Sequence, residues 1–206
     1  IYGNIAKSEY DNSLAVVKGF SKRLDSGGNE VSVIKIYMAG TETSAVVKDG
    51  FKLQEYTIDN AGNKVKSSIK AEDLKQGDIV RLASDSKGYL RWGERVYEAD
   101  TKTFKGSSGS GEYATFSLFV TAGYVAYNDT TLMRLADDKD TAFTSDSDVF
   151  KLNGYIYSSA KIMVVEEGNK KISVTPGSPN DICIGDYVVY QSRSGVGAHL
   201  VVLKNK

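Results

Sequence analysis

Apolar and polar residues alternate along most of the chain. In the segment "EVSVIKIYMAG", Ile34, Ile36 and Met38 fall on one side, and the residues between them fall on the other. This period of two predicts a β-strand with one well-buried face. Similar runs recur along the chain, and turn signals such as Asp25–Glu30 and Asp59–Lys64 separate them. Asn and Gly suit tight hairpins in such turns, so the fold is predicted to be all-β.

One segment with this alternating pattern occurs twice in the chain. The segment Asp73–Leu82 reads "DLKQGDIVRL" and the segment Asp181–Tyr190 reads "DICIGDYVVY", with an offset of 181 − 73 = 108. The Gly-Asp pair in each predicts a turn that leads into a strand, because Gly permits a tight turn and Asp can accept hydrogen bonds from nearby amides. Upstream, the match is expected to begin at Tyr2 in one copy and at Ala122 in the other, which places Gly3 against Gly123. We therefore predict two tandem, similar β-barrel or β-sandwich-like units.

The unit boundaries follow from composition. Residues 105–112 read "KGSSGSGE", and their Gly and Ser content predicts a flexible connector. The first β unit is then expected to cover residues 1–104 and the second residues 113–206. A mobile hairpin loop inside one domain is the alternative interpretation of this segment.

Charge and length narrow the classes of function. The 206 residues contain 26 Lys and Arg and 26 Asp and Glu, so the formal net charge is zero. This balance disfavours nucleic acid as a partner, because phosphate binding needs a basic surface. The apolar runs are too short for a membrane span. The single cysteine, Cys183, excludes an intramolecular disulfide and a thiolate metal site.

The residues that usually carry catalysis are sparse. The single histidine, His199, lies on an alternating segment near the C-terminus with no nucleophile motif beside it, and is interpreted as a half-buried strand residue. Cys183 lies between two isoleucines and is interpreted as a small apolar residue at a strand edge. Motifs that bind phosphate, dinucleotides or zinc do not occur in the sequence. We expect no enzyme activity, no cofactor and no bound metal.

One aromatic residue stands out as a candidate for contact with a partner. Trp92 lies beside Arg91 and close to Arg95, and Trp and Arg are enriched at the centres of protein interfaces. This grouping suggests an exposed contact site. A core position for the indole is the competing interpretation.

Two further patterns allow a functional and a structural interpretation. The acidic stretch Asp137–Asp148 could supply oxygen ligands for calcium, but it lacks the spacing of an EF-hand loop, which favours a solvated loop. Several tyrosines could form a platform on which sugars stack, whereas ordinary packing between strands is the alternative. These tyrosines are Tyr124, Tyr127, Tyr155, Tyr157, Tyr187 and Tyr190.

Three segments carry a family resemblance. They are "YGNIAK", "KAEDLKQGDIVRLASDSKGYL" and "SSAKIMVVEEGNKKISVTPGSPNDICIGDYVVYQSRSGVGAHLVVLKN". In them the chain resembles the all-β repeat regions of clostridial-type S-layer-homology (SLH) cell-surface proteins. The resemblance implies an extracellular structural or spacer protein of a surface layer or filament, which acts at the cell surface through self-association or contact with a cell-wall component. It supplies no catalytic residues. The alternatives are a structural component of a phage or injection-system virion and a carbohydrate-binding adhesion module that binds a polysaccharide.

Overall fold

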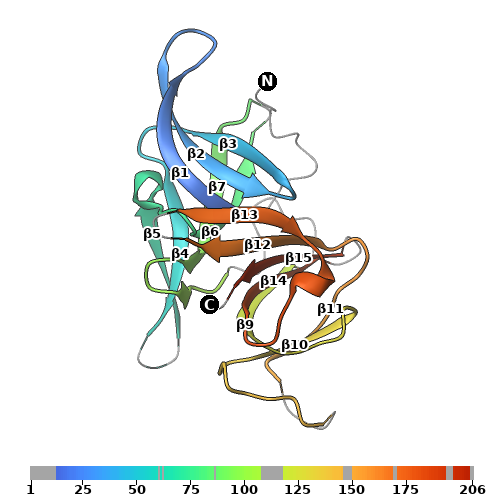
Figure 1. Cartoon of the computed structure of the whole chain (residues 1–206). Helices are drawn as coiled ribbons and strands as arrows, with labels where there is room; N and C mark the ends of the chain where they lie inside the picture. The colour runs from blue at the N-terminus through green and yellow to red at the C-terminus, as the bar shows by residue number, and fades with distance from the viewer. Residues whose placement is uncertain are drawn as a thin grey trace. The chain divides into compact units, whose positions relative to one another are not determined.

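The protein folds into two compact units, which comprise Ile1–Thr115 and Phe116–Lys206. The computed structural model describes residues 13–59, 61, 63–85, 87–107, 118–145, 150–168, 171–193 and 197–204. These residues form fifteen β-strands and two single-turn 3₁₀ helices (Figure 1). The prediction of an all-β chain is therefore confirmed. Within the described part of the chain, no helix is long and apolar enough to cross a membrane.

The first unit is one β-sheet, in which an isolated parallel bridge between Val46 and Tyr89 adds to the strand ladders. Seven of its strands lie in the order β3-β2-β1-β6-β7-β4-β5, and β8 pairs with β7. Neighbouring strands are antiparallel except β4 and β7, which are parallel. The strands are β1 (Leu14–Leu24), β2 (Glu30–Met38), β3 (Thr41–Val47), β4 (Lys52–Ile58), β5 (Lys64–Lys70), β6 (Ile79–Ser84), β7 (Leu90–Glu98) and β8 (Thr103–Phe104).

The second unit repeats the order of the seven main strands of the first, and β8 has no counterpart among its described strands. Its order is β11-β10-β9-β14-β15-β12-β13, and the pair that corresponds to β4 and β7, namely β12 and β15, is again parallel. The prediction of two similar units is confirmed, and in neither unit does a described ladder join the outer strands into a closed barrel. The strands are β9 (Leu118–Asn128), β10 (Leu132–Ala136), β11 (Leu152–Tyr155), β12 (Lys161–Glu167), β13 (Ile172–Gly177), β14 (Tyr187–Arg193) and β15 (Gly197–Leu203).

The register of the central strands fixes how the copies align. Leu14 of β1 pairs with Arg81 of β6, and Ala122 of β9 pairs with Val189 of β14. Both differences, 122 − 14 and 189 − 81, equal 108, the offset of the Gly-Asp motifs. Gly123 therefore corresponds to residue 15. The predicted match of Gly123 with Gly3 is wrong, because it relied on local residue identity instead of on strand pairing, and Gly3 itself lies outside the described residues.

The glycines of the two Gly-Asp motifs make equivalent turns. Gly77 and Gly185 have φ angles of 95° and 89°, a conformation that side chains with a Cβ rarely adopt. The Gly77 amide donates to the carbonyl oxygen of Val17 at 2.9 Å, and the Gly185 amide donates to that of Val125 at 2.8 Å. The interpretation of the motif as a turn that leads into a strand is confirmed.

The aspartates of the motifs also have matching partners. The Asp78 carboxylate accepts a hydrogen bond from the Lys75 amide at 3.0 Å, and the Asp186 carboxylate accepts one from the Cys183 amide at 2.9 Å. Each carboxylate thus closes the turn that follows a 3₁₀ helix, η1 (Ala71–Asp73) or η2 (Pro179–Asp181). The duplicated sequence is a duplicated structural element.

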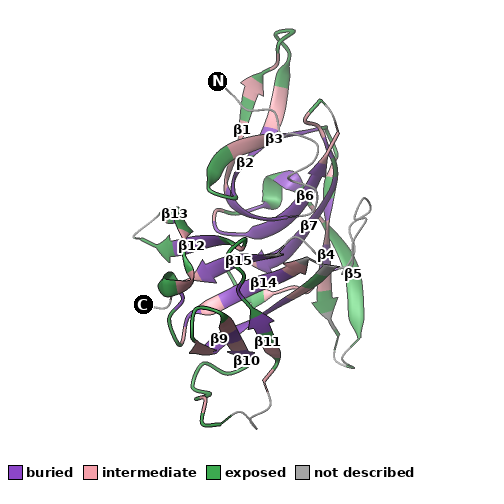
Figure 2. Ribbon diagram, turned by 90° about the vertical axis from the view of Figure 1, so that its right-hand side faces the viewer, coloured by how far each residue is buried: buried purple, intermediate pink, exposed green. Residues whose placement is uncertain are grey.

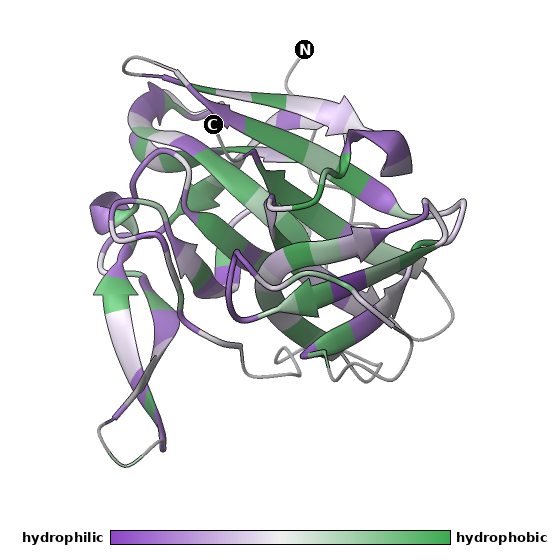
Figure 3. Ribbon diagram, turned by 60° about the horizontal axis from the view of Figure 1, so that its bottom comes forward, coloured by the Kyte–Doolittle hydropathy of each residue, from purple (hydrophilic) through white to green (hydrophobic). Residues whose placement is uncertain are grey.

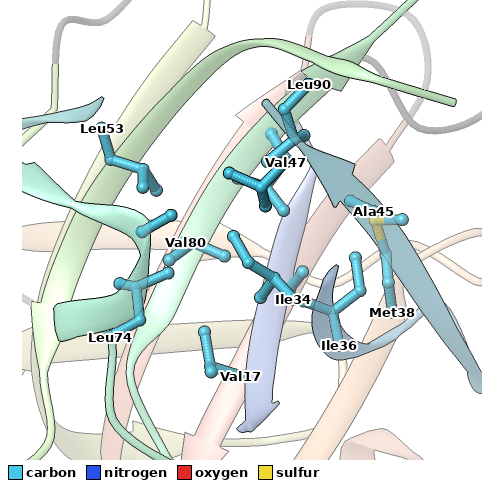
Figure 4. Close-up of a cluster of buried hydrophobic side chains, with 13 residues drawn as sticks. Val17, Ile34, Ile36, Met38, Ala45, Val47, Leu53, Leu74, Val80 and Leu90 are labelled. Atoms are coloured by element: carbon cyan, nitrogen blue, oxygen red, sulfur yellow. The ribbon is translucent and has the colours of Figure 1, made fainter. Parts of the chain in front are cut away.

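Each unit has its own hydrophobic core. Hydrophobic and hydrophilic residues alternate along the strands (Figure 3), and most buried residues lie on the central strands (Figure 2). In the first unit the core side chains converge from six strands (Figure 4). They include Val17, Ile34, Ile36, Met38, Ala45, Val47, Leu53, Leu74, Val80, Leu82 and Leu90. In the second unit the core includes Val125, Met133, Leu135, Ile156, Ile162, Val164, Ile182, Val188, Tyr190, Leu200 and Val202.

The start of the predicted connector packs on the first unit. The Lys105 ammonium lies 2.8 Å from a carboxylate oxygen of Glu98, and the buried Ser107 hydroxyl accepts a hydrogen bond from Arg81 at 2.6 Å. The remaining connector residues, 108–112, lie outside the described residues. Lys105 and Ser107 therefore contribute to the polar contacts of the first unit.

Candidate functional site

The outer strands of the two sheets differ in how they limit pairing with other chains. Strand β5 carries Lys64, Lys66 and Lys70 and is exposed along most of its length (Figure 2). Strand β13 contains Pro176, which has no amide hydrogen to donate. Both features discourage pairing at a sheet edge. Strand β11 is another edge strand, only four residues long, and it ends with the aromatic residue Tyr155.

Two neighbouring tyrosines are exposed at this edge. Ile156 is buried in the core, with 5% of its surface exposed, and its amide donates to the carbonyl oxygen of Thr131 at 2.8 Å. Because successive side chains of an extended chain point to opposite faces, the residues on either side of Ile156 point outward. Tyr155 and Tyr157 are 58% and 59% exposed, their ring centroids lie 6.3 Å apart, and their planes are inclined by 31°.

A second aromatic group surrounds an arginine next to this edge. The Arg134 guanidinium lies 4.5 Å from the ring centroid of Phe143 and 5.5 Å from those of Tyr127 and Phe150. The rings of Tyr127 and Phe143 also contact each other, with centroids 4.6 Å apart. Such contacts between a cation and aromatic faces hold the loop after β10 against the sheet.

Strand pairing places the two groups on one face. Arg134 of β10 pairs with Tyr127 of β9 on one side and with Asn153 of β11 on the other, and Leu132 pairs with Tyr155. Directly paired residues share a face of the sheet. We call this surface the aromatic face. It consists of Tyr127, Arg134, Phe143, Phe150, Asn153, Tyr155 and Tyr157.

The hairpin between β9 and β10 fixes one end of the aromatic face. The Asp129 carboxylate accepts hydrogen bonds from the Leu132 amide at 2.7 Å, the Thr131 amide at 2.9 Å and the Tyr127 hydroxyl at 3.1 Å. The Leu132 amide, followed by the Thr131 side chain and amide, lowers the pKa of Asp129 to about 2. The carboxylate therefore stays ionised at ordinary pH and orients the Tyr127 phenol.

The first unit shows that the fold does not require this aromatic face. In β1 and β2, Gly19 pairs with Lys35 beside a bulge, as Tyr127 pairs with Arg134 beside a bulge in β9 and β10. The positions correspond, because 127 − 19 is again 108. Glycine and lysine are therefore compatible with the same strand geometry.

The edge strands give the same comparison. Ile36 pairs with Val17 and Thr43, and Leu135 pairs with Val125 and Leu152, so Thr43 corresponds to Leu152. Three and five residues further along each chain, Val46 corresponds to Tyr155 and Lys48 to Tyr157. Val46 is buried, whereas Tyr155 is exposed. The two tyrosines thus distinguish the second unit from the first at positions where the fold accepts other residues.

The predicted contact group around Trp92 is not a single exposed patch. Trp92 is buried, with 4% of its surface exposed, because β7 is an interior strand and the Arg81 guanidinium lies 5.4 Å from the indole centroid. Arg91 is exposed. Arg95 is buried and points into an ion cluster. The expectation of an exposed contact at Trp92 and Arg95 is therefore corrected to a structural role.

The ion cluster joins four segments of the first unit. Arg95 donates to Glu55 at 2.7 Å and to Asp78 at 3.3 Å, and its guanidinium lies 3.0 Å from Glu98. The Lys105 ammonium contacts Glu98 as well. Three carboxylates from different strands and turns therefore neutralise Arg95, which explains how an arginine is buried there.

His199 and Cys183 lie apart from the aromatic face. His199 is buried on β15, where it pairs with Gln191 as Trp92 pairs with Ala83 in the first unit. Cys183 is exposed in the turn before β14 instead of at a strand edge, and its Sγ lies 3.3 Å from the Lys204 ammonium.

The predicted tyrosine platform divides into three groups. Tyr155 and Tyr157 form the exposed pair, and Tyr127 lies on the same face. Tyr190 is buried in the core of the second unit. Tyr124 and Tyr187 make an edge-to-face pair with ring centroids 4.9 Å apart, and burial, together with Tyr124 and Asp137, raises the pKa of Tyr187 to about 12.

The acidic stretch Asp137–Asp148 is only partly described, since residues 146–149 lie outside the described part. Within that part, Asp137 forms a 2.6 Å ion pair with Lys151, and Phe143 packs on Arg134. Among the described residues, no group of three or more His, Cys, Asp or Glu side chains could hold a metal ion. Phe143 and Phe150, which the sequence did not single out, connect this loop to the aromatic face.

The signal that could have identified the aromatic face was the internal alignment. Extending the offset of 108 upstream places Tyr127 against Gly19, an exchange that is unexpected for equivalent positions of one fold. The comparisons with known proteins add no relative: no family model, curated protein or solved structure matches the chain.

Proposed function

We propose that the chain is a non-catalytic extracellular structural protein of a bacterial surface layer or filament, which acts as a spacer and through contact with the cell wall or with copies of itself. The observation that carries this proposal is the repeated fold with one altered face. Both units share the order of seven strands and the register of their central strands, yet the second has Tyr127, Tyr155 and Tyr157 where the first has Gly19, Val46 and Lys48. A fold does not determine a function, so the function is inferred from the residues of this site.

Duplication supports the spacer part of the proposal. Two units with separate cores extend the length of chain that is folded, without requiring a larger single core. The Gly-Asp turns and central strand register, which maintain the fold, recur in both copies. One difference between the copies lies in exposed side chains at and just after an edge strand, and exposed aromatic residues supply contact area at low cost in conformational entropy.

Two measurements test the proposal on the whole chain. Sedimentation velocity over a wide concentration range reports self-association, and co-sedimentation with isolated sacculi from Gram-positive bacteria reports wall contact. We expect at least one of them to be positive. A chain that stays monomeric and remains in the supernatant with sacculi would contradict the proposed function.

A further inference from the structure

We propose that the exposed Tyr155 and Tyr157 rings form a binding site for a glycan chain, with Asn153 as a hydrogen-bonding partner. This inference rests on the proposed function and names the wall component as a polysaccharide. The three residues alternate with Leu152, Gly154 and Ile156, so their side chains point to the same, outer side. The result is an open row of two aromatic rings and an amide along β11 and the two residues that follow it.

The chemistry of this row suits a sugar. A pyranose ring has an apolar face of C–H groups and a rim of hydroxyls, and a tyrosine ring has an apolar face and a polar tip. The ring centroids are 6.3 Å apart, which follows from two steps along an extended chain. The exposed Asn153 supplies both a donor and an acceptor for hydroxyl groups beside the rings. The turn after Tyr157 adds the exposed hydroxyls of Ser158 and Ser159.

The size of the row favours a glycan over a second protein. A buried aromatic side chain contributes about 150–250 Å² of contact area. Two tyrosines therefore fall well short of the roughly 800 Å² per partner that a stable protein interface needs. Asn153, Ser158 and Ser159 border the rings with polar groups instead of extending an apolar patch.

The charge of the aromatic face disfavours single-stranded nucleic acid. Such ligands also stack on aromatic rings, but they need a basic groove that follows the phosphates. The guanidinium of Arg134 lies between aromatic rings, and the Lys151 ammonium is paired with Asp137. The ionised Asp129 adds negative charge close to Tyr127.

The first unit supplies a matched variant that preserves the strand. Tyr155→Val together with Tyr157→Lys introduces the residues that the first unit has at the corresponding positions, Val46 in β3 and Lys48 just after it. Because β3 forms with those residues, we expect this variant to fold. Phe119→Ala is the control, since Phe119 is an exposed aromatic residue of the same unit on β9.

The test measures glycan binding directly. Two methods are applied to the whole chain. The first is affinity electrophoresis in gels that contain polysaccharide released from Gram-positive cell walls. The second is calorimetric titration with chitohexaose and cellohexaose. Thermal melting by circular dichroism confirms that each variant is folded. We expect at least one glycan to bind the wild type and the Phe119→Ala variant. Each single alanine variant, Tyr155→Ala or Tyr157→Ala, should bind about tenfold more weakly.

The outcomes separate this inference from the proposed function. Loss of glycan binding in the matched double variant, with binding retained in Phe119→Ala, supports the glycan site. Glycan binding that the double variant retains overturns it. If no glycan binds while the chain still self-associates or pellets with sacculi, the glycan site is wrong and the structural function stands. Binding of an oligothymidylate probe in place of a glycan would also overturn it.

Discussion

Arg81 and Glu94 form a fully buried ion pair in the first unit, with 3.0 Å between Nη1 of the arginine and Oε1 of the glutamate. The residues face each other across β6 and β7. The corresponding pair across β14 and β15 is Val189 and Val201. One fold therefore contains a charged pair in one copy and an apolar pair in the other, at the same place in the register.

This exchange leads to a prediction on stability. Glu94→Val leaves the Arg81 charge buried and should reduce the free energy of unfolding by about 3–5 kcal/mol. The double variant Arg81→Val with Glu94→Val reproduces the second unit and should recover most of that loss. The free energy of unfolding of both variants is measured by urea denaturation, with Trp92 fluorescence as the signal. A double variant as unstable as the single one would show that valines cannot replace the pair in this unit.

Trp92 provides a prediction that separates a core residue from a contact residue. Truncation to Ala removes a buried indole and should reduce the free energy of unfolding by about 3–5 kcal/mol. The exposed neighbour Arg91 is the control, and Arg91→Ala should change stability by less than about 0.5 kcal/mol. Urea denaturation followed by far-UV circular dichroism compares them. Equal, small effects would contradict the buried role of the indole.

Glu98 leads to a prediction on pH dependence. Hydrogen bonds from Lys105 and Thr101, together with the charge of Arg95, lower the pKa of Glu98 from 4.5 to about 2. Because the folded pKa is the lower one, the stabilisation is complete above the unfolded pKa of about 4.5 and is lost as the pH falls towards about 2. The measurement is the melting temperature of the wild type and of Glu98→Gln over this range. The difference in melting temperature between the two proteins should be constant above pH 4.5 and shrink below it. A difference in melting temperature that does not depend on pH would contradict this role of Glu98.

The Gly-Asp turns lead to a prediction that applies to both units. Gly77→Ala and Gly185→Ala each place a Cβ on a residue with positive φ and should cost about 1–2 kcal/mol. Lys75→Ala serves as the control, because its backbone amide still donates to Asp78. Chemical denaturation of the three variants provides the test. If the alanine variants at the two glycines match the control in stability, the turns do not require glycine.

The sequence was sufficient for those features that depend on short segments. Alternation predicted the strands, and the Gly-Asp motifs predicted two equivalent turns, because both signals arise within a few residues. The match of Gly123 with Gly3 was wrong, since the true partner, Ala15, is recognised only through the register of β1 with β6. The correct alignment of the two copies depends on strand pairing between distant segments. Local sequence similarity carries no information about that pairing.

The site was less predictable for the same reason. Arg91 and Arg95 suggested an exposed neighbourhood for Trp92, but Arg95 is neutralised by Glu55 and Asp78, which are distant in sequence. The Tyr155 and Tyr157 pair could be proposed from the alternation alone. The enclosure of Arg134 by aromatic rings could not be predicted from the sequence, because it depends on how the loop after β10 folds back onto the sheet.

In the proposed function, the aromatic face that distinguishes the second unit from the first contacts the cell wall. This contact is tested by co-sedimentation with Gram-positive sacculi. The assay compares the wild type with the double variant that carries Tyr155→Val and Tyr157→Lys. The wild type should pellet with sacculi, and the folded double variant should remain in the supernatant. Equal pelleting of both proteins, or pelleting of neither, would contradict it.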